Sequence, residues 1–461
     1  MKSNKICCIG AGYVGGPTMA VIAEMCPKIH VTVVDIDKFK IDSWNGDINK
    51  LPVYEPGLKE IIQKVRNKNL FFSTDIENAI KQSEIIFIAV NTPTKTEGEG
   101  AGMAADLTFV INTAEQIAKY SISDKIVVEK STLPVRTAEE IKKILNKLNN
   151  KVKFEVLSNP EFLAEGTAIQ DLYKSDRVLI GGDNSESGKK AIDKLVSIYE
   201  NWIPREKIIT SNVWSAELSK LSSNAMLAQR ISSINSLSAL CEKTGAKIQE
   251  VSYSIGKDHR IGEHFLKFSV GFGGSCFKKD ILNLVYLCKT HGLNEVAEYW
   301  HQVVKINDYQ KLRFSNLILD HLKNLNKKNA SILGWAFKKD TNDSRESAAI
   351  DVAFILLKSG ISISVYDPMV NSKKIKTDIE NLFISRGVMD YKSCLSRLVI
   401  HNNISDCITN SSAIAIITEW DEFKKFQWDE IGNISNSDYK IFDGRGIVET
   451  KIQNRLYKIG N

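Results

Sequence analysis

The segment KICCIGAGYVGG, residues 5–16, decides the fold, because a short apolar run leads directly into glycines with the spacing G-x-G-x-x-G. Residues 5–9 predict a buried strand, and residues 17–25 are compatible with a helix. In this setting the first glycine permits a tight turn, the second lets a pyrophosphate approach, and the third lets the helix pack on the strand. The segment therefore predicts a doubly wound parallel sheet that binds a dinucleotide.

A second predicted strand, HVTVVD at residues 30–35, supports the same assignment. It ends on Asp35, where a carboxylate can accept hydrogen bonds from the adenosine ribose. The same charge would repel a 2′-phosphate, so NAD is expected rather than NADP. Lys38 and Lys40 weaken that preference, because they could tolerate added phosphate charge.

Further apolar runs end in loops that are rich in proline and polar residues. Ligands of an open parallel sheet bind beyond the carboxyl ends of its strands, so these loops are candidate site segments rather than mere connections. The loops comprise residues 91–94, 131–134 and 159–166.

The composition is that of a globular protein, with 461 residues, 43% hydrophobic and 25% charged. A net charge of +6 is too small to indicate nucleic acid but suits small anionic ligands. No apolar run is long enough to span a membrane, and the N-terminus does not read as a signal peptide. The eight cysteines are scattered without metal-ligand spacing, so we expect reduced thiols, no metal and a cytoplasmic location.

A long helix is predicted for residues 211–243, where apolar residues recur at spacings of three and four. About 30 residues at 1.5 Å rise give a rod of roughly 45 Å, and such rods commonly bridge domains or dimerise. Lys220 and Asn224 project from the same face of this helix. Taken alone, that pair indicates a solvated patch.

After a polar hinge at residues 323–330 the α/β pattern restarts, without a second dinucleotide fingerprint. Lys338, Lys339 and Arg345 follow its first strand and suit another phosphate-bearing ligand. We therefore expect an α/β protein with two doubly wound Rossmann-like domains, joined by a long central helix and a helical dimerisation domain, with one site in the cleft between the lobes. The expected boundaries are 1–210 for NAD binding, 211–327 for the central domain with the reactive cysteine, and 328–461 for the second Rossmann-like domain.

The segment SVGFGGSCFKKD, residues 269–280, surrounds one thiol with glycines and positive charge. Glycines would let ligands approach Cys276 closely, and Lys278 and Lys279 would favour its thiolate. A buried structural cysteine needs neither feature. The other seven cysteines lie in strand-like or helix-like segments and are interpreted as small apolar residues.

Together these motifs resemble the UDP-glucose 6-dehydrogenase family in its animal-type form, over nearly the whole chain. The resemblance rests on ICCIGAGYVGGPT, VNTPTKT, EKST, SNPEFLAEGTAI, SSNAMLAQRISSINS, VGFGGSCFKKD, AFKKDT with SRES, and IFDGR. It implies four-electron oxidation of UDP-glucose to UDP-glucuronate with two NAD. It also implies that the dehydrogenase is at least a homodimer, since Arg260 would reach the neighbouring subunit's sugar site, and that dimers can form a hexamer.

The resemblance assigns chemical roles to six residues. Cys276 would hold the sugar as a thiohemiacetal and then as a thioester. Lys220 would stabilise oxyanion character and Asn224 would share that work, which overrides the solvated-patch interpretation. The remaining roles are Asp280 holding Lys220 or its water, Glu161 as general base for hydrolysis and Thr132 positioning a water.

The resemblance also implies two sets of binding residues. For NAD these are Gly10, Ala11, Gly12, Tyr13, Val14, Gly15, Asp35, Lys40, Val90, Asn91, Thr92, Pro93, Thr94, Ser131, Thr132, Leu133, Glu165, Cys276, Lys279 and Arg345. For UDP-glucose they are Glu161, Phe162, Leu163, Ala164, Glu165, Lys220, Asn224, Arg260, Lys267, Phe268, Ser269, Val270, Gly271, Phe272, Gly273, Phe337, Lys338 and Arg445.

Two positions depart from the animal-type pattern, and three other functions compete. Lys40 replaces an arginine and loses its planar fork, and Gly446 stands where a second arginine would follow Arg445. The competing functions are a dehydrogenase of UDP-N-acetylhexosamine or GDP-mannose, a two-electron 2-hydroxy-acid dehydrogenase, and a non-catalytic UDP-sugar-binding protein. The second would need no Cys276, and the third would need none of the reactive residues.

Overall fold

The computed structural model describes residues 5–461, which form two compact units. The first unit contains the chain up to residue 223 together with residues 282–290, and the second contains residues 224–281 and 291–461. The predicted three-part division of the chain stays a prediction. Within the described residues, no helix is both long enough and apolar enough to span a bilayer.

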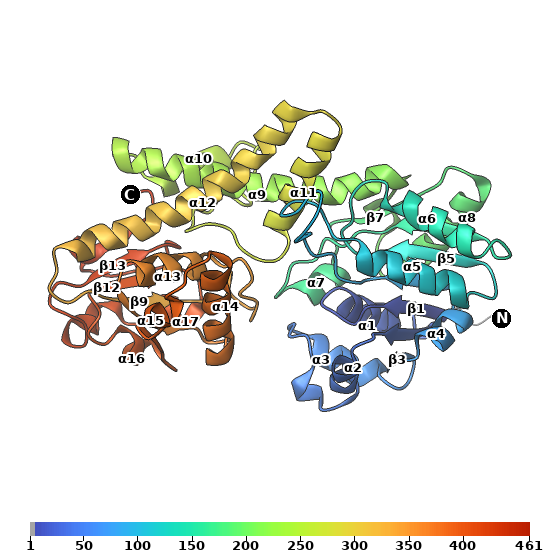
Figure 1. Ribbon diagram of the computed structural model, residues 1–461, viewed down its shortest axis with the longest axis horizontal. Helices are drawn as coiled ribbons and strands as arrows, with labels where there is room; N and C mark the ends of the chain where they lie inside the picture. Colours follow the sequence, from blue (N-terminus) through green and yellow to red (C-terminus); the bar gives the residue numbers. More distant parts are fainter. Residues whose placement is uncertain (1–4) are drawn as a thin grey trace. The chain divides into compact units, whose positions relative to one another are not determined.

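The first unit is built on an eight-stranded sheet in the order β3-β2-β1-β4-β5-β6-β7-β8, and Figure 1 shows its helices. All neighbouring strands are parallel except β6 and β7. The strands are β1 (Lys5–Ile9), β2 (His30–Val34), β3 (Leu70–Ser73), β4 (Ile85–Ile88), β5 (Lys125–Glu129), β6 (Phe154–Ser158), β7 (Val178–Gly182) and β8 (Ile208–Asn212). The helices are α1 (Gly15–Met25), α2 (Lys38–Asn45), α3 (Leu58–Val65), α4 (Ile76–Gln82), α5 (Thr108–Tyr120), α6 (Thr137–Leu148), α7 (Ala168–Tyr173), α8 (Glu186–Tyr199) and the start of α9 (Val213–Thr244).

The strand order of this sheet reverses at β1, which pairs with β2 on one side and β4 on the other. Apolar residues occupy β1 and β4 without alternation, because helices cover both faces of a doubly wound sheet. The crevice beyond the carboxyl ends of β1 and β4 is the place where such folds bind ligands. The sequence prediction of residues 5–9 as the first strand is confirmed.

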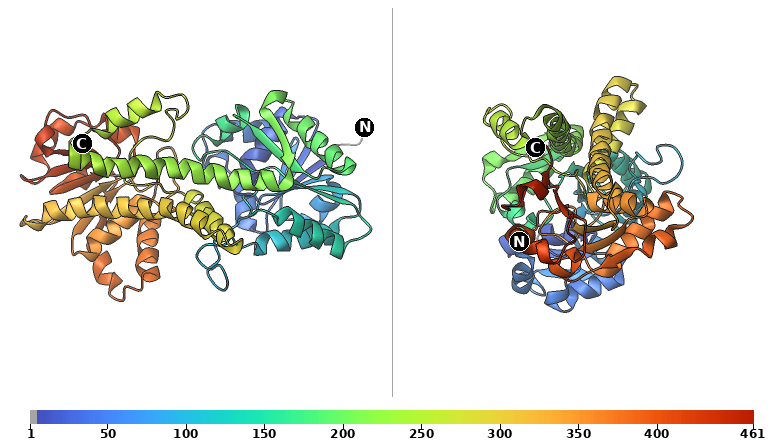
Figure 2. Two further views of the ribbon diagram at one scale, coloured as in Figure 1. Left: turned by 90° about the horizontal axis from the view of Figure 1, so that it is seen from above. Right: turned by 90° about the vertical axis from the view of Figure 1, so that its left-hand side faces the viewer.

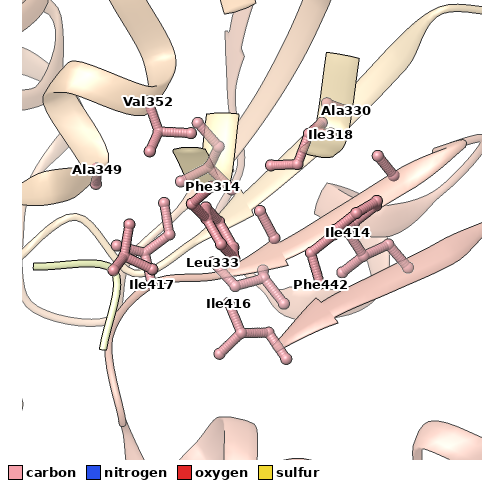
Figure 3. Packing of buried hydrophobic residues seen from close by; sticks show 14 of the residues in the cluster. Phe314, Ile318, Ala330, Leu333, Ala349, Val352, Ile414, Ile416, Ile417 and Phe442 are labelled. Carbon is pink, nitrogen blue, oxygen red and sulfur yellow. The ribbon is translucent and has the colours of Figure 1, made fainter. Parts of the chain in front are cut away.

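The second unit contains a six-stranded, fully parallel sheet in the order β11-β10-β9-β12-β13-β14. Phe314 packs edge to face on Phe442, and Figure 3 shows both rings within the apolar cluster over the sheet. The strands are β9 (Asn329–Leu333), β10 (Ser362–Tyr366), β11 (Leu398–Ile400), β12 (Ala413–Ile416), β13 (Lys440–Asp443) and β14 (Leu456–Lys458). The helices are α10 (Ile248–Gly256), α11 (Phe277–Thr290, which continues into the first unit), α12 (Asn294–Lys323), α13 (Ala348–Lys358), α14 (Ser372–Ser385), α15 (Tyr391–Leu395), α16 (Ile404–Ile408) and α17 (Asp421–Lys425).

The predicted long helix is present as α9, one unbroken helix of 32 residues. Its C-terminal part lies along α12, as Figure 2 shows, and Ser232 Oγ donates to the carbonyl oxygen of Val303 at 2.8 Å. Arg313 of α12 also pairs with Glu242 of α9 at 2.5 Å. The 30-residue helix α12 was not predicted, since polar residues such as Asn307, Gln310 and Lys311 interrupt the apolar spacing on its buried face.

Helix α6 begins without a side-chain cap of its own, and a residue of α9 caps it instead. The Glu217 carboxylate accepts the backbone N–H groups of Arg136 and Ala138 at 2.7 and 2.8 Å. Glu129, at the end of β5, lies against Glu217, and both residues are at most 2% exposed. Among the described groups, neither oxygen of Glu129 has a hydrogen-bond donor. A hydrogen bond between Glu129 and Glu217 can form only when one of the two carboxyl groups carries a proton.

This buried carboxyl pair makes stability depend on pH. Burial raises the pKa of Glu129 well above its ordinary value of 4.5, and the Glu217 carboxyl raises it further. The folded protein therefore keeps a proton that the unfolded chain releases above about pH 4.5, so the free energy of unfolding falls as pH rises from there to the raised pKa.

We predict that Glu129→Gln, which gives Glu217 a permanent donor, is more stable than the parent at pH 8 by about 1 kcal/mol. The advantage should shrink at pH 5, where Glu129 of the parent is protonated. Urea unfolding at both pH values measures this stability difference, with Glu140→Gln on the exposed side of α6 as control. A stability difference that is the same at both pH values would contradict the shared proton.

Candidate functional site

The glycine-rich turn after β1 has the surroundings that a dinucleotide cradle requires. Gly10 has φ +111°, and a Cβ there would collide with the carbonyl oxygen of Ala89. A Cβ on Gly15 would collide with the Gly10 carbonyl, which shows that α1 packs directly on the turn. No atom lies within 4 Å of the position of a Cβ on Gly12. The open side of this turn therefore fits the approach of a pyrophosphate.

Asp35 lies just after β2 and faces the same turn. It is 8% exposed, and it accepts the N–H of Ala11 at 2.9 Å and that of Asp37 at 3.0 Å. Lys40 Nζ lies 2.8 Å from Asp35 Oδ2, so its charge is committed to this carboxylate. Burial by itself would raise the pKa of Asp35, but the bonds from Lys40, Ala11 and Asp37 outweigh burial and lower it. Asp35 is therefore an ionised acceptor suited to ribose hydroxyls.

The loops after β4 and β5 are tied together at the same end of the sheet. Ser131 Oγ donates to the carbonyl oxygen of Val90 at 2.7 Å, and Thr92 Oγ1 donates to that of Thr132 at 3.2 Å. Leu133 is buried beneath them. The structure thus brings together the two loops that the sequence assigned to the cofactor.

The loop after β6 carries Glu161, which is held from several sides. Its Oε1 accepts the N–H groups of Phe162 and Leu163 at 2.7 and 3.0 Å, and its Oε2 pairs with Lys130 at 2.9 Å. Lys220 Nζ lies 5.2 Å from the centre of the Phe162 ring. In the first unit, therefore, Glu161 is bonded to the backbone of Phe162 and Lys220 lies over the ring of the same residue.

Two residues of this neighbourhood were not assigned from the sequence. Lys130 belongs to the motif EKST, but the resemblance gave it no role. Arg177 stacks on Phe162, with its guanidinium carbon 3.9 Å from the ring centre. A charged residue directly after a buried strand was the available signal for Lys130. Nothing in the sequence points to Arg177, because it lies outside the recognised motifs.

Cys276 lies directly before α11 and is the exposed member of the eight free cysteines. The other seven are buried or half-buried, which confirms their interpretation as apolar residues. The carbonyl oxygen of Cys276 accepts the N–H of Asp280 at 2.8 Å, and the Asp280 carboxylate accepts Asn224 Nδ2 at 2.6 Å. The thiol therefore lies at the positive end of a helix dipole, above a buried Asn–Asp contact.

The lysines and glycines beside Cys276 also have contacts within the protein. Lys278 pairs with Glu346 at 2.9 Å and Lys279 with Asp280 at 3.5 Å, so neither ammonium is an uncompensated charge for the thiol. A Cβ at Gly273 would lie 2.6 Å from the carbonyl oxygen of Glu346 and one at Gly274 would lie 3.0 Å from the Phe337 ring. These glycines are thus required by protein packing before any ligand is considered.

The predicted substrate segment, residues 267–273, is fixed by amide side chains of two helices. Asn235 of α9 accepts the N–H of Ser269 at 2.8 Å, and Gln310 of α12 donates to the Ser269 carbonyl at 2.7 Å. Asn307 of α12 bonds both the N–H and the carbonyl of Phe272, at 2.8 and 3.0 Å. Within the segment, Lys267 is exposed while Phe268, Ser269 and Val270 are buried.

The three predicted arginines of the second unit are ion-paired. Arg445 pairs with Glu419, and the Arg345 guanidinium pairs with Asp343 at 2.7 Å. The Arg260 side chain pairs with Asp258 at 2.5 Å and is 78% exposed, while Lys338 lies 5.6 Å from the Phe337 ring centre. These charges are positioned at loop ends, where an anionic ligand could compete for them.

Gly446 has a structural reason to differ from arginine. It has φ +68°, and a Cβ there would lie 2.6 Å from Phe268 Cζ. A side chain at this position would therefore be strained and would require the Phe268 ring to move.

The first unit offers an ammonium and an ionised carboxylate, and the second unit offers an exposed thiol. Within residues 5–461, no group of three or more His, Cys, Asp or Glu residues could hold a metal ion. The roles of the individual residues are proposals, taken up below.

Three family models match the chain in succession. The NAD binding domain of the UDP-glucose/GDP-mannose dehydrogenase family matches residues 4–203, its central domain matches residues 214–309, and its UDP binding domain matches residues 331–450. UDP-glucose 6-dehydrogenase 3 of Oryza sativa subsp. japonica is 53% identical over 467 residues, covering 99% of this chain and 95% of the rice protein.

A second plant relative and one solved structure agree with these models. UDP-glucose 6-dehydrogenase 3 of Arabidopsis thaliana is 54% identical over 462 residues, again covering 99% of this chain and 95% of the relative. The UDP-glucose dehydrogenase of the archaeon Pyrobaculum islandicum matches with a TM-score of 0.83 at 27% identity, covering 99% of this chain and 96% of that chain. The motifs resemble the animal-type form, whereas both sequence relatives named here are plant proteins.

We predict that Asp35→Asn weakens NAD binding by about 10- to 100-fold, because charge-assisted bonds to the ribose are worth about 1.5–3 kcal/mol. Binding of NADP should weaken less, since the repulsion of its 2′-phosphate is removed. Titration of the purified protein with both cofactors measures this. Asp42→Asn on the exposed face of α2 is the control, and equal NAD affinity in all three proteins would rule out the ribose contact.

Proposed function

The chain belongs to the UDP-glucose/GDP-mannose dehydrogenase family, and we propose that Cys276 carries its reaction through a covalent intermediate. The activity is the NAD-dependent oxidation of UDP-glucose to UDP-glucuronate. The observation that carries the covalent proposal is the exposure of one thiol among eight, at the start of a helix and within a glycine-bounded turn.

A covalent intermediate answers a problem of electron count. Oxidising the 6-hydroxymethyl group to a carboxylate removes four electrons, and each NAD, when bound, accepts two of them as a hydride. The aldehyde formed first must be retained until the second oxidation. Addition of the Cys276 thiolate gives a thiohemiacetal, loss of a second hydride gives a thioester, and hydrolysis releases the acid and the thiol.

The other reactive residues supply charge and protons in this scheme. Lys220 stabilises negative charge that develops on the C6 oxygen. Asn224, oriented by its bond to Asp280, shares that stabilisation. Glu161 accepts a proton from the attacking water, and Thr132 positions that water. These proposed roles are supported by the contacts that fix each side chain within its own unit.

The binding roles follow the two sheets. The turn at Gly10–Gly15, Asp35 and the paired loops after β4 and β5 hold NAD. The fixed segment at residues 267–273, with Phe337, Lys338 and Arg445, holds the UDP-sugar. The amide contacts to Ser269 and Phe272 support the second role, because they keep the segment's backbone in one conformation.

We extend the proposal to assembly and location. The proposed assembly is a homodimer that can assemble further into a hexamer. It is supported by exposed Leu237 and Leu240, which are neighbours on one face of α9, since adjoining exposed apolar side chains commonly mark interfaces. The exposed Arg260 is available to a neighbouring subunit. A cytoplasmic location is supported by eight free cysteines.

We predict two NADH per sugar when the purified protein turns over limiting UDP-glucose with excess NAD. The same assay with UDP-N-acetylglucosamine and GDP-mannose should give little or no NADH. One NADH per UDP-glucose would indicate a two-electron enzyme, and a better yield from another nucleotide sugar would reassign the substrate.

We predict that Cys276→Ser lowers UDP-glucuronate formation by roughly 10³-fold or more, because the acyl-carrying nucleophile is lost. An oxidised intermediate should be trapped or released, which product analysis by mass spectrometry would detect. Cys394→Ser, at the half-buried thiol of α15, is the control and should keep parental activity. Equal losses in the two variants would show that the thiol assignment is wrong.

A further inference from the structure

One buried lysine of the first unit has no role in the mechanism above, although it touches Glu161. Lys130 follows β5 directly and is 3% exposed. Its Nζ lies 2.9 Å from Glu161 Oε2, 3.2 Å from Asn159 Oδ1 and 3.3 Å from Tyr199 Oη. Three contacts match the three N–H groups of an ammonium, so the protein interior satisfies this charge fully.

Lys125, at the other end of β5, shows what Glu161 contributes. Lys125 is also 3% exposed, and its ammonium donates to the carbonyl oxygen of Ser83 at 2.5 Å. Burial lowers the pKa of Lys125. Burial acts in the same direction on Lys130, but the Glu161 carboxylate and the Tyr199 hydroxyl outweigh it and raise the pKa of Lys130. A directly paired carboxylate distinguishes the two buried lysines.

The same pair controls the charge of Glu161. Burial by itself would raise the pKa of Glu161, and the Lys130 ammonium outweighs burial and lowers it. Lys220 of α9 acts in the same direction from farther away. On the Lys130 side, the titratable neighbours are the Tyr199 hydroxyl of α8 and the Cys8 thiol of β1.

We propose that Lys130 is a positioning residue for thioester hydrolysis, which fixes the Glu161 carboxylate and keeps it unprotonated. This inference rests on the proposed role of Glu161 as the base. In the step, the water oxygen bonds to the thioester carbon and the carbon–sulfur bond breaks. The water proton passes to Glu161, and the electron pair leaves on the Cys276 sulfur. A purely structural ion pair is the alternative, but buried ion pairs contribute little stability over apolar packing.

The test is Lys130→Met, compared with Lys125→Met as the matched loss of a buried ammonium at the other end of β5. Without Lys130 the buried Glu161 carboxyl takes up a proton at low pH and releases it as pH rises. Rapid mixing of the holoenzyme with UDP-glucose should therefore show a retained burst of two NADH per active site. The steady rate after the burst should fall at least about tenfold at pH 6 and approach the parental rate at pH 9.

Lys125→Met should keep the parental ratio of rates at the two pH values. The proposal is overturned if Lys130→Met keeps the parental pH profile. It is equally overturned if burst and steady rate fall together at both pH values, since a damaged structure would slow every step.

Two further variants separate this inference from the role of Glu161 itself. Glu161→Gln should retain the burst and hydrolyse slowly at every pH, and parental hydrolysis would overturn the proposed base without reference to Lys130. The double variant Lys130→Met with Glu161→Gln removes both charges, so it avoids an unpaired buried carboxylate. Its hydrolysis should match that of Glu161→Gln within about twofold. A much slower double variant would show that Lys130 acts by another route.

Discussion

The buried ion pair between Lys130 and Glu161 joins the ends of two neighbouring strands, and much of the first unit's site depends on it. Lys130 extends β5 and is followed by the cofactor loop, while Glu161 lies in the loop after β6. Tyr199 of α8 also reaches the pair, through its bond to Asn159. Moving any one of these elements would leave a charge buried without its partner, which costs several kcal/mol. The pair thus holds together two loops for which different roles, cofactor binding and hydrolysis, are proposed.

The loop after β6, which carries Glu161, can be long because β7 runs antiparallel to β6. A parallel neighbour would require a crossover from one end of the sheet to the other, whereas β7 returns antiparallel from the same edge. The intervening chain is therefore free to form the segment with Glu161 and Phe162. Asn159 ties this segment back to β7 through the carbonyl oxygen of Leu179, at 2.8 Å.

In the second unit the corresponding constraint is close packing of backbone. Residues 267–274 pass between α9, α12 and the loop after β9, and the glycines leave no room for side chains. The Asn224–Asp280 contact then orients the first turn of α11, at whose start Cys276 lies. The exposed thiol is consequently presented by a rigid support, which suits a nucleophile that must hold an intermediate.

Local patterns determined part of this protein. The glycine spacing after residues 5–9 and the carboxylate of Asp35 predicted the first parallel sheet and its dinucleotide-binding turn, because such turns depend on residues adjacent in the chain. The glycines and charges around Cys276 likewise distinguished one thiol from seven others. The second unit could be predicted as α/β, but α12 could not, because Asn307, Gln310 and Lys311 stand on its buried face where apolar residues would be expected.

Only the tertiary structure decided which charges meet. Lys278 pairs with Glu346, Glu129 lies against Glu217, and Lys130 pairs with Glu161. In each case the two residues are far apart in the sequence. A sequence shows that a lysine follows a strand, but it does not show whether a carboxylate from another strand or helix will neutralise it. Burial and partner together set the protonation of these groups, and both arise from packing between elements that are distant in the chain.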